Sequence, residues 1–336
     1  MSKTRVGING FGRIGRQVFK IIEQRYRDRL DVVAINDLTN TETLSYLLKY
    51  DSVYGRFDGE VSYDESALRI NGRSIALFAN REPAKIPWNE YAVDLVLEST
   101  GRFTRGELAA GHLEAGVKKV LISAPAKGDI DGTVVMGVND DALTPDWKVF
   151  SNASCTTNCA ALMVKGVHDA VGIDRAAITV IHAYTNDQSL HDQPHHELRR
   201  ARAAAVSLIP ASTGSATDIT KVIPALTGRL SSVAMRTPNI CGSIVDLVCQ
   251  TNRPTSAEEI NNAFRKMAED RPDLIDCTGD PIVSVDILGT SVSCTIDTSL
   301  TTVVDDTMVK VMGWFDNEWG YANRCADLLA DLSRMS

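Results

Sequence analysis

The sequence lacks the features that mark membrane proteins and nucleic-acid-binding proteins. No apolar stretch approaches membrane-spanning length. Basic residues do not dominate, because 35 Lys and Arg stand against 43 Asp and Glu and give a formal charge of −8. A general nucleic-acid binder needs basic surface to displace counterions. Internal repeats and low-complexity tracts are also absent from the sequence. We expect no nucleic-acid partner and no membrane association.

Paired cysteines are missing as well. The seven cysteines are scattered and odd in number, without the spacing of a disulfide framework. Cys155 and Cys159 have no second pair nearby to complete a zinc site. The N-terminal residues 1–5 run directly into a glycine loop and leave no room for a signal peptide. These observations predict no metal site and a cytoplasmic, reducing location.

The pattern of the first 150 residues predicts an α/β fold. Residues 5–9 form a short apolar run, and apolar residues at helical spacing follow from 14 to 22. Further strands are expected at 32–36, 94–98 and 120–123. Strands that alternate with helices are typical of a doubly wound parallel sheet of the Rossmann type.

The sequence after Cys155 has a different pattern of predicted strands and helices. Runs with polar alternation indicate longer strands with few helices between the last of them; these runs are 177–183, 231–236, 243–250, 292–297 and 308–315. This pattern predicts an α+β domain with a mainly antiparallel sheet. The tail carries apolar residues on one helical face. We therefore expect a first domain at 1–153, completed by a C-terminal helix at 319–336, and a second domain at 154–318.

The glycines at the start of the chain predict a dinucleotide site. Gly10, Gly12 and Gly15 follow a strand and open a helix. Gly10 permits the tight turn, Gly12 lets the backbone approach a pyrophosphate, and Gly15 lets the helix pack closely on the strand. The pyrophosphate is expected at the helix N-terminus. The alternative is a glycine turn in an unrelated βα unit.

Asp37 indicates which dinucleotide binds. It ends the second expected strand, 22 residues after Gly15, near the spacing of a carboxylate that accepts hydrogen bonds from ribose hydroxyls. The same charge repels a 2′-phosphate. The predicted cofactor is therefore NAD rather than NADP, and the first domain is the NAD-binding domain.

Cys155 is the candidate nucleophile. Polar residues precede it, and a helix-like run extends from it to Gly172, a natural stop. Ser151 or Asn152 is a plausible N-cap, which would place Cys155 in the first helical turn. The positive end of the helix dipole there favours a thiolate. The alternative is an unreactive buried cysteine.

A thiolate nucleophile needs an acid–base partner. His182 ends the apolar run 178–181 and is expected at a strand terminus, where catalytic residues are often displayed. The alternative is a structural histidine without a catalytic role. The remaining histidines of this stretch lie in a polar segment and are expected to face solvent; they are His191, His195 and His196.

Three segments have the chemistry for binding an anion. Thr213 and Gly214 offer a hydroxyl and backbone N–H groups in a flexible turn. Arg236 closes a predicted strand and suits a bidentate clamp. The run 198–202 carries three arginines, among them Arg200. The alternative interpretation is that this run lies on a solvent-exposed surface and binds nothing.

Taken in order, these segments resemble those of the phosphorylating glyceraldehyde-3-phosphate dehydrogenase family over essentially the whole chain. The segments that carry the resemblance are INGFGRIGR at 8–16, LKYDS at 48–52, SNASCTTNC at 151–159, HAYTNDQ at 182–188 and WFDNEWGY at 314–321. The cysteine segment and the last segment are the most specific to the family.

The resemblance implies oxidation of D-glyceraldehyde 3-phosphate to 1,3-bisphosphoglycerate with reduction of NAD, in glycolysis or gluconeogenesis. Cys155 would attack the aldehyde with His182 as the general base, and a thioester would then react with inorganic phosphate. The loop 184–208 resembles the segment that lies near the cofactor of a neighbouring subunit in the family. The resemblance therefore also implies a homotetramer.

Motif matching extends the implied site. Thr185 and Arg236 would hold the substrate phosphate. The residues implied for the attacking phosphate are Ser154, Thr156, Arg200, Thr213 and Gly214. Beyond the three glycines, the residues implied for NAD are Arg13, Ile14, Asp37, Arg81, Ser123 and Asn317.

Two segments depart from the family pattern. After the Ser212–Gly214 turn the family usually continues Ala-Ala-Lys, whereas residues 215–218 of this chain read Ser-Ala-Thr-Asp and place an acid near the expected phosphate site. Residues 237–242 read Thr-Pro-Asn-Ile-Cys-Gly instead of Val-Pro-Thr-x-Asn-Val. Two alternative functions stay open. One is an erythrose-4-phosphate dehydrogenase, although the chain keeps the segments 184–186 and 212–214 that this subfamily alters. The other is a non-catalytic NAD-binding interaction protein of the same fold.

Overall fold

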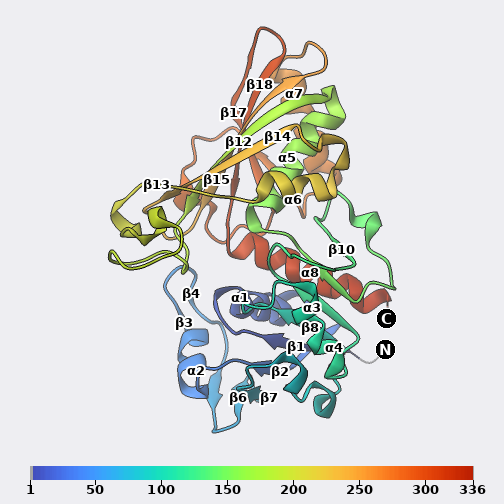
Figure 1. Cartoon of the computed structure of the whole chain (residues 1–336), viewed down its shortest axis with the longest axis vertical. Helices are drawn as coiled ribbons and strands as arrows, with labels where there is room; N and C mark the ends of the chain where they lie inside the picture. Colours follow the sequence, from blue (N-terminus) through green and yellow to red (C-terminus); the bar gives the residue numbers. More distant parts are fainter. Residues whose placement is uncertain (1–2, 336) are drawn as a thin grey trace. The chain divides into compact units, whose positions relative to one another are not determined.

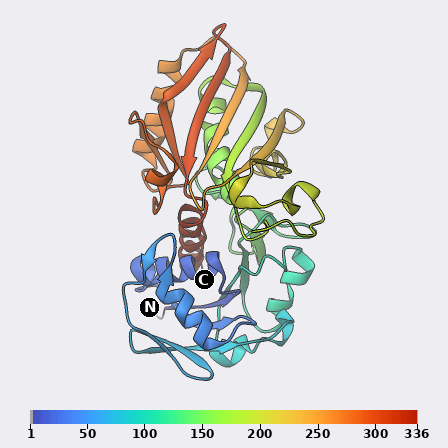
Figure 2. The ribbon, with the colours of Figure 1, turned by 90° about the vertical axis from the view of Figure 1, so that its left-hand side faces the viewer.

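The computed structural model describes residues 3–335 and divides into two compact units (Figures 1 and 2). The first unit comprises the chain up to Val134, together with Asp141–Ala153 and the C-terminal segment from Ala322. The second unit comprises Val135–Asp140 and Ser154–Tyr321. The short segment Val135–Asp140 therefore groups with the second unit, whereas the sequence assigned it to the first domain.

The first unit is built on a nine-stranded sheet in the order β10-β11-β9-β8-β1-β2-β7-β6-β5. All pairs from β10 to β7 are parallel, and the β7–β6 and β6–β5 pairs are antiparallel. The strands are β1 (Thr4–Asn9), β2 (Leu30–Asn36), β5 (Val61–Tyr63), β6 (Ala67–Ile70), β7 (Arg73–Phe78), β8 (Leu95–Glu98), β9 (Lys119–Ile122), β10 (Gly132–Thr133) and β11 (Val149–Ser151); β3 (Tyr50–Asp51) and β4 (Gly55–Arg56) form a separate hairpin.

Helices connect the parallel strands, as right-handed βαβ crossovers require. They are α1 (Arg13–Ile21), which continues as a π-helical turn over Ile22–Tyr26, α2 (Thr41–Lys49), α3 (Gly106–Ala109) and α4 (Gly111–Glu114), with short 3₁₀ turns at Pro83–Lys85 and Trp88–Tyr91. Most of the C-terminal helix α8 (Trp319–Met335) also belongs to this unit but follows the last strand of the chain. The end of the α1 segment is tied to α8, because Arg25 bonds to Asn323 and the Tyr26 hydroxyl donates to Asp327. The C-terminal helix thus packs into the first unit from the far end of the chain.

The second unit contains a seven-stranded mixed sheet in the order β13-β14-β12-β15-β18-β17-β16. Four neighbouring pairs are antiparallel, and the β12–β14 and β16–β17 pairs are parallel. The strands are β12 (Ile173–Ala183), β13 (Ile209–Ala211), β14 (Leu230–Thr237), β15 (Ser243–Thr251), β16 (Ile275–Thr278), β17 (Cys294–Val304) and β18 (Met308–Phe315).

Three helices lie against this second sheet, α5 (Cys155–Val171), α6 (Ser215–Val222) and α7 (Ala257–Asp270) (Figure 1). Helix α5 contacts four strands of the sheet and both other helices. It is buried along most of its length, which fits its run of apolar residues, and it ends at Gly172 with a φ of +73°. The predicted fold class, a Rossmann-type parallel sheet followed by a mainly antiparallel α+β unit, is confirmed.

Two further findings concern residues 3–335. No helix in this part of the chain is both long enough and apolar enough to cross a membrane. It also contains no group of three or more His, Cys, Asp or Glu side chains arranged to hold a metal ion. The seven cysteines are free thiols, and five of them are buried.

Candidate active site

Cys155 is the first residue of α5. The N-cap is Ser154, whose Oγ accepts the N–H of Thr157 at 3.0 Å. The prediction of Ser151 or Asn152 as the cap was wrong: Ser151 instead accepts the N–H of Ala153 through its hydroxyl, and Ala153 has a φ of +52°. The chain therefore turns sharply just before the helix, and this turn places the thiol at the helix start.

The thiol faces the imidazole of His182. Sγ of Cys155 lies 3.5 Å from Nε2 of His182, which is 4% exposed and next to last in β12. Nδ1 of the imidazole lies 2.6 Å from the carbonyl oxygen of Ala183. Nη1 of Arg236 also lies 3.1 Å from Nδ1, but the carbonyl is nearer and only accepts. We therefore assign the proton to Nδ1, so that Nε2 presents its lone pair to the thiol. The neutral imidazole is thus oriented to receive the thiol proton.

Strand pairing brings Arg236 to the same place. Strands β12 and β14 run parallel with His182 opposite Arg236. Nη1 of Arg236 lies 3.2 Å from the Ala183 carbonyl and 3.2 Å from Oγ1 of Thr185. The ring of Phe315 packs edge-on against the imidazole, with centroids 5.8 Å apart. The site combines a buried imidazole with a thiol and a guanidinium whose residues are half-buried.

Burial controls the protonation of the pair. It raises the pKa of the Cys155 thiol, and the Arg236 charge and the Thr156 N–H lower that pKa only in part. Burial and the same guanidinium lower the pKa of His182 to about 3. The expectation that the helix start makes Cys155 a thiolate was therefore wrong, because desolvation outweighs the nearby positive groups. Thiol and imidazole are both neutral near pH 7, and the proton moves only when charge develops during attack.

Removing the Arg236 charge should make Cys155 less reactive. In Arg236→Gln the thiolate loses a favourable charge, so the pKa of Cys155 rises further. We expect iodoacetamide to alkylate Cys155 about three- to tenfold more slowly at neutral pH, with the rate profile displaced to higher pH. Arg236→Lys keeps a positive charge, so its alkylation rate should be closer to that of the unmodified protein. Cys155→Ala supplies the background from other thiols, and identical profiles for Arg236→Gln and the parent would contradict this electrostatic account.

The glycine loop of the first unit has the geometry of a phosphate cradle. Gly10 has a φ of +91°, and a Cβ there would lie 2.7 Å from the backbone N of Thr100. A Cβ on Gly15 would lie 2.2 Å from the carbonyl oxygen of Gly10. At Gly12, by contrast, a Cβ would meet no heavy atom of the described chain within 4 Å. Gly10 and Gly15 serve close packing, while Gly12 borders open space.

The start of α1 suits an anion. Gly12 is the N-cap, and within the described residues no side chain caps the helix and its first turn contains no acid. Asp37 is tied to the loop, because its Oδ2 accepts the N–H of Phe11 at 2.7 Å. Its Oδ1 accepts the N–H of Thr39 at 2.9 Å. These residues fit a dinucleotide: the helix start would take the pyrophosphate, and the carboxylate would accept hydrogen bonds from ribose hydroxyls.

A buried network beneath the loop was missed by the sequence analysis. Glu98, 2% exposed, accepts hydrogen bonds from Asn9 at 2.5 Å and from the N–H of Thr100 at 2.9 Å. His112 lies 3.1 Å from the same carboxylate, and its other ring nitrogen accepts from Trp88 Nε1 at 3.0 Å. Because Asn9 precedes Gly10, this network fixes the entrance to the loop. Apart from Thr100, these partners lie 14 to 103 residues apart in the chain, so a local sequence pattern could not predict the network.

Comparison with known proteins decides the family. The model of the glyceraldehyde 3-phosphate dehydrogenase NAD binding domain matches residues 4–106, and that of the C-terminal domain matches residues 154–317. The chain is 51% identical to glyceraldehyde-3-phosphate dehydrogenase of Geobacillus stearothermophilus, over 97% of each chain. It is 50% identical to that of Thermotoga maritima, over 98% of this chain and 99% of the relative, and 49% identical to glyceraldehyde-3-phosphate dehydrogenase 2 of Streptomyces avermitilis, over 96% and 97%.

The chain belongs to the glyceraldehyde 3-phosphate dehydrogenase family. The resemblance found in the sequence is thereby confirmed. The prediction that the protein is an NAD-dependent dehydrogenase is confirmed as well, because the N-terminal match is to the family's NAD binding domain.

For this member of the dehydrogenase family, the residues predicted to bind phosphate lie on two connected segments. Thr185 contacts both Arg236, at 3.2 Å, and Asp187. Asp187 in turn pairs with Arg200, whose Nη2 donates to the Ser212 carbonyl at 3.2 Å. Arg200 therefore pairs directly with the Asp187 carboxylate, and Arg236 is linked to it through the Thr185 hydroxyl. Asp187 lies in the segment 182–188, and its role could not be predicted from the sequence.

The rest of the predicted phosphate set lies at two helix starts. Ser154 caps α5, and Thr156 is buried in its first turn. Thr213 and Gly214 precede α6, with Oγ1 of Thr213 2.8 Å from the Ser215 hydroxyl. Arg200 itself is 8% exposed and bonds to Glu197 at 2.7 Å. The alternative interpretation, in which the arginine run is exposed to solvent, is therefore wrong for Arg200. Arg199 and Arg202 are exposed.

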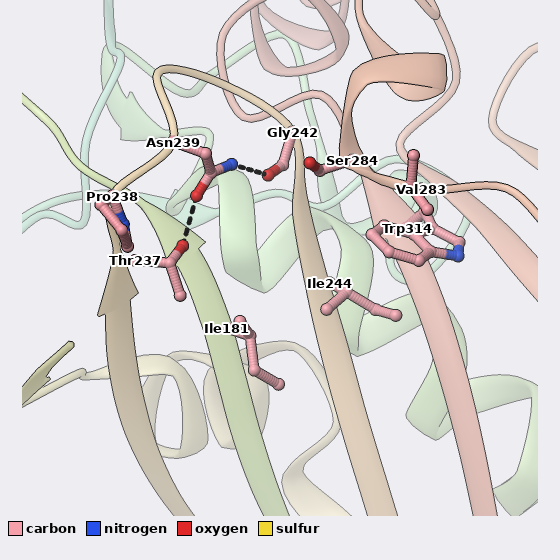
Figure 3. A pocket seen from close by; sticks show the side chains of 9 residues that line it. All are labelled: Ile181, Thr237, Pro238, Asn239, Gly242, Ile244, Val283, Ser284 and Trp314. Atoms are coloured by element: carbon pink, nitrogen blue, oxygen red, sulfur yellow. Dashed lines mark hydrogen bonds between the residues drawn. The ribbon is translucent and has the colours of Figure 1, made fainter. Parts of the chain in front are cut away.

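The two departures from the family pattern have structural explanations. Asp218 is buried in the first turn of α6 and pairs with Lys221 at 2.8 Å, so a local cation balances its charge. Asn239 closes the loop 237–242 by donating to the carbonyl of Cys241 at 2.9 Å. It also donates to the carbonyl of Gly242 at 2.7 Å (Figure 3). Gly242 has a φ of +85°, and a Cβ there would lie 2.1 Å from the carbonyl oxygen of Ser284.

A cavity of about 380 Å³ borders this loop. Its apolar wall includes Ile181, Ile244 and Trp314, and Thr237 and Asn239 line its polar side (Figure 3). The cavity is not formed by the thiol–imidazole pair.

The remaining predicted cofactor residues are placed as follows. Arg13 pairs with Asp51 at 2.9 Å, Ile14 is half-buried, and Arg81 is exposed. The Ser123 hydroxyl donates to the Glu98 carbonyl at 3.1 Å, at the carboxyl end of the parallel sheet. Asn317 belongs to the second unit and is 4% exposed. The residues Arg13, Ile14 and Asp37 thus gather around the α1 start or its loop.

Proposed function

We propose that the protein oxidises D-glyceraldehyde 3-phosphate to 1,3-bisphosphoglycerate with NAD and inorganic phosphate, through a thioester on Cys155. The observation that carries the proposal is the contact of Cys155 with a neutral imidazole whose tautomer leaves Nε2 open to the thiol. The named relatives carry the same activity in their names. The glycolytic or gluconeogenic setting belongs to the same proposal.

The chemistry begins with proton transfer from Cys155 to Nε2 of His182, while Sγ bonds to the aldehyde carbon. The oxygen of the resulting thiohemiacetal is stabilised by the backbone N–H of Cys155 at the α5 start and by the imidazole. The imidazolium gives its proton to this oxygen, which forms the thiohemiacetal hydroxyl. His182 then takes that proton back, and the carbon loses a hydride and becomes a thioester. Bound NAD supplies the acceptor for that hydride. Attack by phosphate breaks the C–S bond, releases the acyl phosphate and returns the thiol.

We propose two anion-binding roles around this pair. Thr185 and Arg236 hold the substrate phosphate. The residues proposed for the attacking phosphate are Ser154, Thr156, Arg200, Thr213 and Gly214. Support comes from Arg200, which pairs with Asp187, from Arg236, which donates to Thr185, and from the hydroxyls at the starts of α5 and α6. Asp187 lowers the free charge of this region until an anion arrives.

For the cofactor, we propose contacts from Gly10, Gly12, Gly15 and Asp37, and further contacts from Arg13, Ile14, Arg81, Ser123 and Asn317. The domain assignment follows: residues 1–153 with the helix 319–336 bind NAD, and residues 154–318 carry the catalytic groups. Ser336 lies outside the described residues. Preference for NAD over NADP rests on the Asp37 carboxylate, which repels a 2′-phosphate.

We also propose a homotetramer located in the cytoplasm. Support for assembly is the loop 184–208, which exposes Leu190, Leu198, Val206 and Leu208 by 66% or more of their surface. Support for the location is the reactive thiol, which a reducing compartment keeps free. Analytical ultracentrifugation and fractionation of cells test the two statements separately.

Phosphate dependence tests the proposed reaction. With glyceraldehyde 3-phosphate and NAD, we expect sustained NADH formation only when phosphate or arsenate is present. Without either, NADH should appear as a burst of about one equivalent per active site and then stall, because the thioester has no acceptor. Equal steady rates without phosphate, or preference for a four-carbon aldehyde phosphate, would favour an erythrose-4-phosphate dehydrogenase. NAD binding without any burst would favour the interaction protein.

A further inference from the structure

Ser243 lies between the catalytic imidazole and a second functional side chain. It is the first residue of β15, directly after the loop 237–242, and it is 1% exposed. Its Oγ accepts the backbone N–H of Ala183 at 3.1 Å and donates to Oδ1 of Asn317 at 3.0 Å. A hydroxyl carries one proton and two lone pairs, so both bonds form at the same time.

The contact with Ala183 holds the end of the strand that carries His182. The β12–β15 ladder has its last pair at Ile181 and Ile244, so the N–H of Ala183 lies beyond the ladder. The Ser243 hydroxyl supplies the acceptor there. Because the carbonyl of the same Ala183 residue orients Nδ1 of His182, displacement of Ala183 would rotate the imidazole away from the thiol.

The contact with Asn317 fixes the direction of its carboxamide. Oδ1 of Asn317 receives the Ser243 hydroxyl and also the N–H of Gly242 at 3.1 Å, and the Cys241 thiol lies 3.6 Å away. Donors that converge on Oδ1 identify it as the oxygen and leave Nδ2 on the opposite side of the amide as a donor. Asn317 is therefore held as a hydrogen-bond donor for a carbonyl group.

We propose that Ser243 is a positioning residue that joins the imidazole of His182 to the carboxamide of Asn317 in one fixed geometry. Through Ala183 it keeps the base aligned with Cys155. Through Asn317 it fixes the direction of an amide N–H donor within the second unit. The second part rests on the proposed role of Asn317 toward NAD, whereas the first part depends only on contacts within the second unit.

Ser243→Ala tests the proposal with two independent readouts. We expect iodoacetamide to alkylate Cys155 about fivefold more slowly without any cofactor, and the dissociation constant of NAD to rise about fivefold, as loss of one buried hydrogen bond predicts. Ser243→Thr keeps the hydroxyl and should therefore retain most of the alkylation rate of Cys155 and most of the affinity for NAD. The matched control is Thr251→Val at the other end of β15, which removes a buried hydroxyl bonded to the carbonyls of Arg253 and Thr307 at 2.8 and 3.0 Å.

A double-mutant cycle with Asn317→Asp separates the two arms, since aspartate keeps the acceptor for Ser243 and removes the amide donor. In that background Ser243→Ala should still slow alkylation but should no longer weaken NAD binding. The proposal is overturned if Ser243→Ala changes neither readout, if Thr251→Val changes both equally, or if the NAD effect persists in full beside Asn317→Asp. Failure of the unmodified protein to reduce NAD would count against the proposed function instead, because alkylation is measured without substrate or cofactor.

Discussion

Cys155→Ser should abolish NADH formation from glyceraldehyde 3-phosphate, with a loss of about 10⁴-fold or more. The serine hydroxyl is a far weaker acid than the thiol, and the neutral His182 imidazole, with its pKa lowered to about 3, is a weak base. Proton transfer that is feasible from sulfur is therefore unfavourable from oxygen. An oxygen ester would also transfer its acyl group to phosphate more reluctantly than a thioester.

The same variant should bind NAD as tightly as the parent, because the glycine loop and Asp37 belong to the other unit. Steady-state rates and a titration with NAD give the two results. Cys159→Ala is the matched control: Cys159 lies one turn later on α5, is fully buried, and directs its thiol to Met163 and to the Gly313 carbonyl. Near-normal turnover in Cys155→Ser, or an equal loss in Cys159→Ala, would remove Cys155 from the mechanism.

His182→Asn should lower kcat by about 10²- to 10⁴-fold, the usual worth of a positioned general base. Nε2 of His182 lies 3.5 Å from Sγ of Cys155 and is positioned to accept its proton. Because burial raises the pKa of the thiol, the remaining thiolate fraction near neutral pH is small without a proton acceptor. Activity of the variant should therefore rise with pH over the alkaline range instead of reaching a plateau.

The pH–rate profile and the alkylation profile of Cys155 measure this effect together. KM for NAD should stay within about twofold, since the glycine loop is unchanged. A variant with unchanged kcat would show that the thiol is activated by another group. A variant with the same pH profile as the parent, only scaled down, would assign His182 to orientation of the substrate rather than to proton transfer.

Local sequence patterns predicted most of the fold. Met308–Phe315 forms β18 as expected, and the apolar run before His182 places that residue at a strand end. The glycine loop was also predicted from the spacing of its glycines. The structure leaves no room for a Cβ at Gly10 or Gly15, because backbone atoms lie close to both. These features depend on alternation, helical spacing and turn chemistry, which act over a few residues.

The parts that the sequence did not reveal depend on contacts between distant residues. The protonation of Cys155 was misjudged because the helix start is local, whereas desolvation comes from the whole unit around the thiol. Ser243 carries no motif, yet it joins residues 60 and 74 positions away along the chain. The N-cap was misplaced by two or three residues because the left-handed turn at Ala153 cannot be read from an alanine.

Trapping of the acylated enzyme tests the central claim most directly. The protein is mixed with glyceraldehyde 3-phosphate and NAD without phosphate, quenched in acid during the NADH burst, and digested for mass spectrometry. The account predicts a phosphoglyceroyl group on the peptide that contains Cys155, in an amount equal to the NADH formed, and its loss within one turnover after phosphate is added. NADH formation without acylation of Cys155, or acylation at another residue, would contradict the account.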